Sequence, residues 1–487
     1  MKKSLTILLL LSMLLTLASC GGTTQTDAPA VTASSTEPVI TTEAETEPPI
    51  VYPDYDGYTF VFGFRDEAGN NWTVYDLDTE AMDGEAFNDA IFVRNSMLEE
   101  RYNIEITTLS MGGGYGVMLE NAEKSILAGD PDFTVLASGT RDVTSWALRG
   151  ELLDLMTFET LNLDQPWWDQ TAQENLILNN KLYFTTGDFT TVDNFATHCI
   201  FFSKQLIVDF SLDDPYELVR SGLWTLDKLI EMASVVTADL DGNGVMNEND
   251  RYGMAVWADN CFGLMQASGN MIARRGEGGL TLTVDSESMF NWWEKMTAFT
   301  KSGNVFITNT DKSLLDYAKH ELYIGHFLEN NAVLFGGCYV GHAADFRAND
   351  ADFGIIPHAK FSELQERYYA AAHYQSAMVG IPITDEDHDR TGTILDAVSA
   401  ASGDVTKAWY DINLVSKSLR DDDSAEMLDL IYSNRSYDLG YYYRIGNLQD
   451  VIATAFRERN DALASKIAAA KTSAEKGLAE ANAFFYE

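Results

Sequence analysis

The stretch that decides the fold is Tyr58-Thr59-Phe60-Val61-Phe62-Gly63-Phe64, which ends near Asp66. It is a short run of aromatic and β-branched residues, and such runs form buried strands. Helical and strand-forming segments then alternate, namely a helix over 88–102, a strand over 104–110, a helix over 118–127, a strand over 133–137 and a helix that ends before Gly150. This order predicts a mainly parallel sheet covered by helices, and hence an α/β fold.

Two loops of this first sheet are candidate ligand contacts. Ligands of open parallel sheets bind at the carboxyl ends of the strands, near a topological switch point. Asp66 follows the first strand, and Ser138 follows the third. We therefore expect Asp66 and Ser138 to lie near a ligand cleft.

The remainder of the chain predicts a second lobe. β-forming runs over 181–186 and 198–202 mark the departure from the first lobe. The elements expected after them are helices over 225–236, 287–302 and 313–328, strands over 332–335, 353–356 and 378–383, and helices from Arg390 onward, with one long amphipathic helix over 450–485. We expect the strands over 332–335 and 353–356 to return to the first lobe, and the helices from Arg390 onward to complete the second. Several crossings between lobes would form a hinge that suits closure.

The N-terminus has the pattern of an export signal. Lys2 and Lys3 precede an uncharged apolar stretch, and Leu17-Ala18-Ser19-Cys20 places small residues before a cysteine. This is the pattern of a bacterial lipoprotein signal over residues 1–20, in which Cys20 is acylated and becomes the new N-terminus. The alternative is an ordinary signal peptide with a chance cysteine. We expect a lipid-anchored protein on the extracellular face of the cytoplasmic membrane.

The segment after the signal predicts a tether. Residues 21–50 contain no aromatic residue, Lys or Arg and are rich in Thr, Ala, Ser, Glu and Pro. Such a composition cannot bury enough apolar surface to fold, so we expect a disordered linker over 21–53. A simple spacer without a role of its own is an equal alternative.

Charge and cysteine content exclude some classes of protein. The sequence has 74 Asp and Glu against 33 Lys and Arg, a formal charge of −41, and this charge repels nucleic acid and anionic lipid. The same charge favours a neutral or cationic ligand over an anionic one. Beyond Cys20 only Cys199, Cys261 and Cys338 remain, so a disulfide framework is excluded, although a single bridge stays open.

The loop over 239–250 follows the register of an EF-hand calcium loop. The expected ligands are the side chains of Asp239, Asp241, Asn243, Asn247 and Asp250 and the main-chain carbonyl of Val245. Gly244 permits the sharp turn at position six, and Asp250 stands where Glu is usual, which resembles the calcium loops of dockerins. We expect a structural Ca²⁺ ion here. The alternative is an Asx- and Gly-rich surface turn that binds no metal.

Several stretches, taken together and in this order, resemble one known family. They are Asp164-Gln165-Pro166-Trp167-Trp168, Lys181-Leu182-Tyr183-Phe184-Thr185-Thr186-Gly187-Asp188, Asp213-Asp214-Pro215-Tyr216-Glu217-Leu218-Val219, Gly222-Leu223-Trp224-Thr225-Leu226-Asp227-Lys228-Leu229 and Gly380-Ile381-Pro382. The chain resembles the extracellular solute-binding proteins of carbohydrate ABC importers, in the group related to maltodextrin-binding receptors. The resemblance covers nearly all of 55–487.

This resemblance implies a two-lobed flytrap fold of the type II periplasmic-binding-protein class with a hinge crossed several times. The expected lobes are 54–187 with 335–383, and 188–334 with 384–487. The resemblance also implies a monomer without enzymatic activity that binds a carbohydrate and delivers it to membrane permease subunits. We expect this carbohydrate to be an oligosaccharide.

A sugar site combines aromatic platforms, which stack on C–H faces, with polar groups that bond hydroxyls. The remaining candidate contacts are Asp188, Trp257, Asp259, Tyr339 and Tyr374. Each has a plainer alternative, since aromatic residues often pack in the core and loop aspartates often have no specific role.

Two other classes of protein compete with the importer receptor. One is a lipid-anchored glycoside hydrolase, which needs two carboxylates at a defined separation. The other is a calcium-dependent carbohydrate-binding adhesin of the cell surface.

Overall fold

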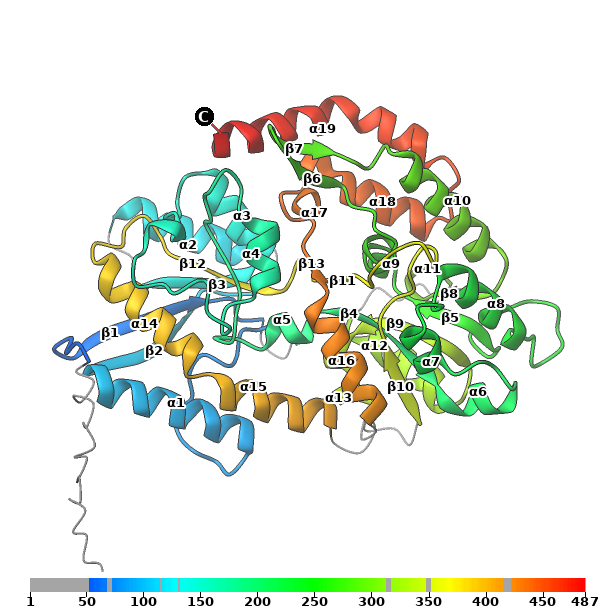
Figure 1. The fold of residues 1–487 in the computed structure, drawn as a ribbon, viewed down its shortest axis with the longest axis horizontal. Coiled ribbons are helices and arrows are strands. Elements are labelled where there is room, and N and C mark those ends of the chain that lie inside the picture. The colour runs from blue at the N-terminus through cyan, green and yellow to red at the C-terminus, as the bar shows by residue number, and fades with distance from the viewer. Residues whose placement is uncertain are drawn as a thin grey trace, which may run out of the picture. The chain divides into compact units, whose positions relative to one another are not determined.

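A computed structural model gives the fold of the chain (Figure 1). It describes residues 52–67, 72–113, 116–129, 132–311, 317–346, 352–415 and 422–486. The predicted signal peptide, the lipidation of Cys20 and nearly all of the predicted linker lie outside the described residues. No helix in the described part of the chain combines the length and the apolar character needed to span a membrane.

The first sheet has four strands in the order β12-β3-β1-β2. These are β1 (Tyr58–Phe64), β2 (Ile104–Ser110), β3 (Val135–Gly139) and β12 (Ala377–Gly380). β1 pairs in parallel with β2 and β3, whereas β12 runs antiparallel to β3. Phe60 and Phe62 are fully buried, because β1 is a central strand of the sheet. The helices α1 (Ala86–Tyr102), α2 (Val117–Ala128) and α3 (Thr140–Leu148) alternate with these strands, which confirms the predicted α/β order.

The second sheet has five strands in the order β10-β4-β9-β5-β8. These are β4 (His198–Ser203), β5 (Tyr252–Val256), β8 (Val305–Ile307), β9 (Val333–Tyr339) and β10 (Phe353–Ile356). β5 pairs in parallel with β8 and β9, whereas β4 runs antiparallel to β9 and β10. Among its helices, α8 (Leu226–Val236) packs on β5 and α12 (Tyr317–Glu329) packs on β9, while α10 (Glu287–Lys301) contacts β8.

The remaining elements connect or flank the two sheets. They are η1 (Leu155–Thr157), α4 (Gln170–Leu176), α5 (Val192–Phe195), α6 (Lys204–Asp209), α7 (Pro215–Arg220), η2 (Ala258–Asn260), α9 (Cys261–Ala267), β6 (Ala273–Gly276), β7 (Gly279–Leu282), α11 (Thr308–Asp311), η3 (Val340–His342), α13 (Ala343–Phe346), β11 (Ala370–Ala371), α14 (His388–Ala400), α15 (Gly403–Tyr410), the π-helix η4 (Asp411–Val415), α16 (Asp422–Ser433), β13 (Arg435–Ser436), α17 (Leu439–Tyr442), η5 (Ile445–Asn447), α18 (Leu448–Arg457) and α19 (Leu463–Tyr486).

The strands predicted over 332–335 and 353–356 do not return to the first sheet. β9 and β10 instead pair with the two edges of β4, with Phe202 opposite Phe335 and Phe201 opposite Ile355. All six residues of β4 are buried, so its two edges need partner strands to satisfy their backbone groups. The placement of these two strands in the first lobe was therefore wrong. Only the last predicted strand, β12, joins the first sheet.

The helices from Arg390 onward are divided between the two sides, contrary to the prediction. α14 and α15 pack against α1, which covers the first sheet, and Arg94 Nη1 of α1 donates to Ser402 Oγ at 3.1 Å. α16 instead contacts β10 of the second sheet. An amphipathic helix shows in its sequence that one face is buried, but it does not show against which sheet. The first and last residues of each lobe stay predictions.

The C-terminal tail forms two helices in place of the single helix predicted over 450–485. α18 ends at Arg457, and Arg459 has a left-handed φ of 50°. The amides of Arg459 and Asn460 donate back to the carbonyls of Phe456 and Ala455, which ends the helix. After this turn α19 runs along the hairpin β6–β7, where Asn482 Oδ1 accepts from the amide of Leu280 at 2.7 Å (Figure 1). Residues 181–186, predicted as a β-forming run, form no named strand and contribute two isolated bridges, Lys181 with Leu178 and Thr185 with Val379.

The chain crosses between the two sheets several times. Residues 188–197 follow the bridge between Thr185 and Val379 of β12 and lead to β4. Residues 372–376 lead from β11 back to β12. A third connection lies between α15 and α16. These crossings confirm the predicted hinge of several segments. The cysteines Cys199, Cys261 and Cys338 are buried, and none of these three forms a disulfide.

Candidate ligand-binding cavity

A cavity of about 450 Å³ lies where three strands of the two sheets end. β3 is followed by Arg141 at the start of α3, β5 by Trp257 and Asp259, and β8 by Asn309, and all four residues line the cavity. The wall is completed by Tyr374 of the 372–376 crossing and by residues of α17 and α18. The cavity therefore lies at the carboxyl ends of strands from both sheets, where open α/β sheets bind their ligands.

Aromatic side chains form much of the cavity wall. Phe262 and Tyr441 pack with ring centroids 4.4 Å apart, and Tyr374 meets Tyr441 edge-on at 5.6 Å. Trp257 and Tyr442 also line the cavity. Aromatic faces bind the apolar C–H faces of a sugar ring, so this wall suits a carbohydrate.

Two polar atoms at the cavity have no hydrogen-bond partner among the described residues. They are the hydroxyl of Tyr441, a residue that is 3% exposed, and Oδ1 of Asn309. A buried polar group without a partner costs free energy, and a bound ligand that supplies the partner recovers this cost. Burial raises the pKa of Tyr441, so its hydroxyl stays protonated and can donate to a ligand.

Charged groups line the side of the cavity formed by α18. Arg444 Nη2 lies 2.8 Å from Asp450 Oδ2. Burial, and next the negative charge of Asp450, raises the pKa of Asp259 to about 6. The positive charge of Arg457 and a hydrogen bond with Trp257 act in the opposite direction.

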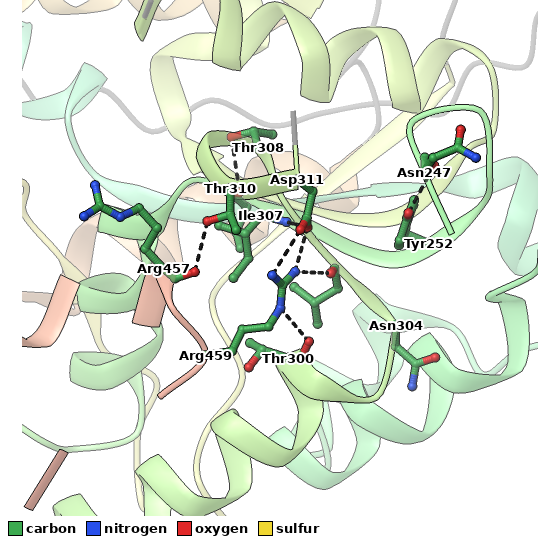
Figure 2. Close-up of polar contacts among 12 residues, drawn as sticks. Asn247, Tyr252, Thr300, Asn304, Ile307, Thr308, Thr310, Asp311, Arg457 and Arg459 are labelled. Carbon is green, nitrogen blue, oxygen red and sulfur yellow. Dashed lines mark hydrogen bonds and ion pairs between the residues drawn. The ribbon is translucent and has the colours of Figure 1, made fainter. Parts of the chain in front are cut away.

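Arg459 holds the end of α18 against the second sheet. Its guanidinium makes a bidentate pair with Asp311, at 3.0 Å and 2.6 Å, and donates to the carbonyls of Thr300 and Val305 (Figure 2). Thr310 Oγ1 donates to the carbonyl of Arg457 at 3.0 Å. Figure 2 shows the side chain of Arg457 directed away from this network. The network therefore positions the backbone of Arg457 while leaving its guanidinium available to the cavity.

Three of the seven predicted contacts, Trp257, Asp259 and Tyr374, line this cavity together. Three others are engaged elsewhere. Asp66 accepts from Ser110 Oγ, Ser138 donates to Asp142, and Tyr339 packs in an aromatic cluster with ring centroids 5.4 Å from Trp72 and 4.7 Å from His198. That any of these residues binds a ligand stays a prediction.

The seventh predicted contact, Asp188, lines a different cavity, beside the buried side chain of Arg435. Arg435 Nη1 lies 2.8 Å from both Asp169 Oδ2 and Asp193 Oδ2. Burial raises the pKa of Asp193 to about 7 and that of Asp188 to about 6, against the attraction of Arg435. Because these carboxylates lie at the crossing over 188–197, the cluster ties that segment to β13.

The prediction missed several cavity residues, namely Arg141, Tyr441, Arg444, Asp450 and Arg457. One signal in the sequence could have identified part of this set. Tyr441, Tyr442 and Tyr443 form a run of three tyrosines that begins three positions after Asp438, which caps α17 through the amides of Gly440 and Tyr441. The other residues carry no local signal, because they are brought together only by the packing of α3 and α18.

The predicted calcium loop brings its acidic side chains together. Ligand atoms of Asp239, Asp241 and Asp250 lie within 4.8 Å of one another. Asp239 accepts from the amides of Gly244 and Gly242, both at 2.7 Å, and the bond from Gly244 is the main cause that lowers the pKa of Asp239. Carboxylate oxygens at this separation fit the donor set that a hard cation prefers.

No protein-family model and no curated protein sequence matches this chain. Solved structures with a similar fold include the acarbose-binding GacH receptor of Streptomyces glaucescens, with a TM-score of 0.55, 13% identity and coverage of 87% of this chain and 99% of that one. The galacto-N-biose/lacto-N-biose I-binding protein of an ABC transporter from Bifidobacterium longum has a TM-score of 0.56, 11% identity and coverage of 89% and 98%. Maltose-bound MalE3 of T. maritima has a TM-score of 0.53, 14% identity and coverage of 86% and 99%. This likeness confirms that the chain has the two-lobed α/β fold of periplasmic binding proteins.

Proposed function

We propose that this protein is a solute-binding protein of an ABC importer, which binds a carbohydrate and delivers it chemically unaltered to membrane permease subunits. The observation that carries the proposal is the cavity at the ends of β3, β5 and β8, with its aromatic wall and with polar atoms of Tyr441 and Asn309 that have no hydrogen-bond partner in the part of the chain that the structure describes. The structures of similar fold contain maltose, acarbose and lacto-N-biose, which is consistent with a carbohydrate ligand.

Ligand binding would close the two lobes. Arg141 of α3 belongs to the first sheet, whereas Trp257 and Asn309 follow strands of the second, so a bound ligand can contact both sides. A ligand that makes more contacts in the closed state shifts the population toward that state. Small-angle scattering would detect this as a smaller radius of gyration with ligand than without.

The proposal is tested by a thermal-shift screen of mono- and oligosaccharides on the purified protein, followed by calorimetry and product analysis. We expect one narrow group of carbohydrates to raise the melting temperature and to be recovered intact. Tyr441→Phe should weaken binding, because it removes the buried hydroxyl, whereas Tyr52→Phe, outside the cavity, should not. Release of reducing ends would instead identify a glycoside hydrolase, for which Asp259 and Asp450 are the carboxylates in the cavity.

The export signal, the acylation of Cys20 and the linker over 21–53 belong to the same proposal. They would hold the protein on the outer face of the cytoplasmic membrane, within reach of the permease, as a monomer that does not bind nucleic acid. Cys20→Ala should release the protein into the medium while leaving carbohydrate binding unchanged. Retention of this variant in the membrane fraction would contradict the lipid anchor.

We also propose that the 239–250 loop binds a structural Ca²⁺ ion. The side chains of Asp239, Asp241, Asn243, Asn247 and Asp250 and the carbonyl of Val245 would supply its oxygens. Added calcium should raise the melting temperature and EGTA should lower it. Asp241→Asn should reduce this response, whereas Asp285→Asn, an exposed aspartate outside the loop, should preserve it. A melting temperature indifferent to both reagents would contradict the site.

A further inference from the structure

The cavity wall has the opposite balance of charge from the rest of the protein. Three arginines, Arg141, Arg444 and Arg457, line it together with two carboxylates, Asp259 and Asp450. Among the residues that the structure describes, no lysine, histidine or glutamate lines it. Over the whole chain, acidic residues outnumber Lys and Arg by 74 to 33. Composition alone would therefore place an excess of carboxylates at this site. The excess of guanidinium groups is a local feature that the net charge of the sequence hides.

One arginine is already neutralised within the protein. Arg444 Nη2 pairs with Asp450 Oδ2 at 2.8 Å, and Gln449, with its amide oxygen turned toward Arg444, accepts from the same Nη2 at 2.9 Å. This pair contributes little net charge to the cavity. Asp259 is the second carboxylate of the cavity wall and is near the charge of Arg457, whereas Arg141 also acts on the buried carboxylate of Asp142.

Arg457 is the arginine most available to a ligand. It is exposed at the end of α18, and its guanidinium makes no hydrogen bond among the described residues. Its positive charge acts on Asp259 across the cavity without a direct bond. The contacts of Arg459 with Asp311 and of Thr310 with the carbonyl of Arg457 hold the backbone in place (Figure 2). A basic residue in the last turn of a helix is also favoured by the helix dipole, so Arg457 alone would not define a site.

The second arginine approaches from the other sheet. Arg141 lies in the first turn of α3, directly after β3, whereas Arg457 ends α18 on the side of β8. A planar guanidinium binds a carboxylate through two parallel N–H···O bonds, and such charge-assisted bonds are about twice as strong as neutral ones. An anionic group between the two arginines would therefore be contacted from both lobes.

Building on the proposed function, we propose that the carbohydrate carries a carboxylate, as a uronic acid oligosaccharide does, and that Arg457 and Arg141 recognise that carboxylate. Trp257 and Tyr441 would contact the sugar rings, and the guanidinium groups would select the acidic sugar over its neutral counterpart. The net charge of the chain predicted the opposite preference, because it averages over surfaces far from the cavity.

The test is isothermal calorimetry with matched pairs of di- and trisaccharides. Each pair consists of an oligouronate and its neutral counterpart from the galactose, glucose and mannose series. We expect at least one oligouronate to bind about tenfold or more tightly than its neutral partner, a difference of about 1.4 kcal/mol. Added salt should weaken the binding of the acid and leave that of the neutral sugar unchanged.

Arg457→Gln should remove most of the preference for the acid without lowering the melting temperature. Arg149→Gln is the matched control, because it removes the same charge from an exposed pair with Glu123 outside the cavity. Equal or tighter binding of the neutral sugars, or an unchanged preference in Arg457→Gln, would overturn the inference while leaving carbohydrate binding intact. Failure of every sugar, acidic or neutral, to bind would instead refute the proposed function, and with it the inference.

Discussion

His358 should make the protein less stable in acid, and the structure sets the size of the effect. Its side chain is fully buried after β10, and neither ring nitrogen has a hydrogen-bond partner among the described residues. Burial lowers the pKa of His358 from 6.5 to about 3. The packing around it is close, because a Cβ on Gly263 would lie 2.8 Å from His358 Nε2 and 2.7 Å from His198 Nδ1.

The direction of the effect follows from the depressed pKa. Above the usual value of 6.5 the imidazole is neutral in both the folded and the unfolded chain, and the native state has its full stability. As the pH falls below that value, His358 becomes protonated in the unfolded chain, whereas in the folded protein it stays neutral down to about pH 3. Between about pH 7 and about pH 5 this one histidine therefore lowers the free energy of unfolding by about 2 kcal/mol.

The measurement is urea denaturation, followed by tryptophan fluorescence, of the wild type and of His358→Gln at about pH 7 and about pH 5. Comparison with a variant is needed because buried carboxyls act in the opposite direction. The pKa of Asp193 is raised to about 7 and that of Asp259 to about 6, so these groups add stability as the pH falls. On acidification His358→Gln should lose about 2 kcal/mol less than the wild type does. His326→Gln, at an exposed position, is the matched control. An equal change in the wild type and in His358→Gln would refute the argument.

Three further perturbations test the packing of the fold. Asp396→Leu should lower the free energy of unfolding by about 3 kcal/mol, because Asp396 accepts hydrogen bonds from the indole nitrogens of Trp167 and Trp168 and from Asn162. Equilibrium denaturation measures this loss, which should be smaller for Asp396→Asn. Gly253→Ala should lower the free energy of unfolding by about 3 kcal/mol, because the new Cβ would overlap the backbone of Ala233 where α8 packs on β5. A melting temperature equal to that of the wild type would disprove this close approach. Arg459→Gln should cost only about 1–2 kcal/mol by the same measurement, because its pair with Asp311 is partly exposed, but it should also weaken ligand binding by releasing the end of α18.

Much of the first lobe could be predicted because its signals are local. The type and spacing of their own residues predicted three elements, namely the strands over 58–64 and 104–110 and the helix over 88–102. The structure has a strand or helix at each of these places. Helix ends are local in the same way. Asp214 and Thr225 each cap the following helix with a side-chain oxygen, at positions that the sequence alone marks.

The site was only partly predictable because its residues are distant in sequence. Trp257 and Asp259 could be found, since an aromatic and an acidic residue stand two positions apart in one short stretch of sequence. Arg141 and Arg457 are 316 positions apart in the sequence. Both line one cavity only because β3 and β8 end at that cavity. Nothing in the neighbourhood of either residue distinguishes it from a solvated surface arginine.

The sequence by itself determined the alternation of helices and strands, the acidic surface and the expectation of a ligand at the strand ends. Only the tertiary structure decided which sheet β9 and β10 join, where the tail turns, and which charges face the cavity. The physical reason is that secondary structure depends on neighbours within a few residues, whereas strand pairing and the walls of a cavity depend on backbone edges and side chains that meet only after the chain has folded.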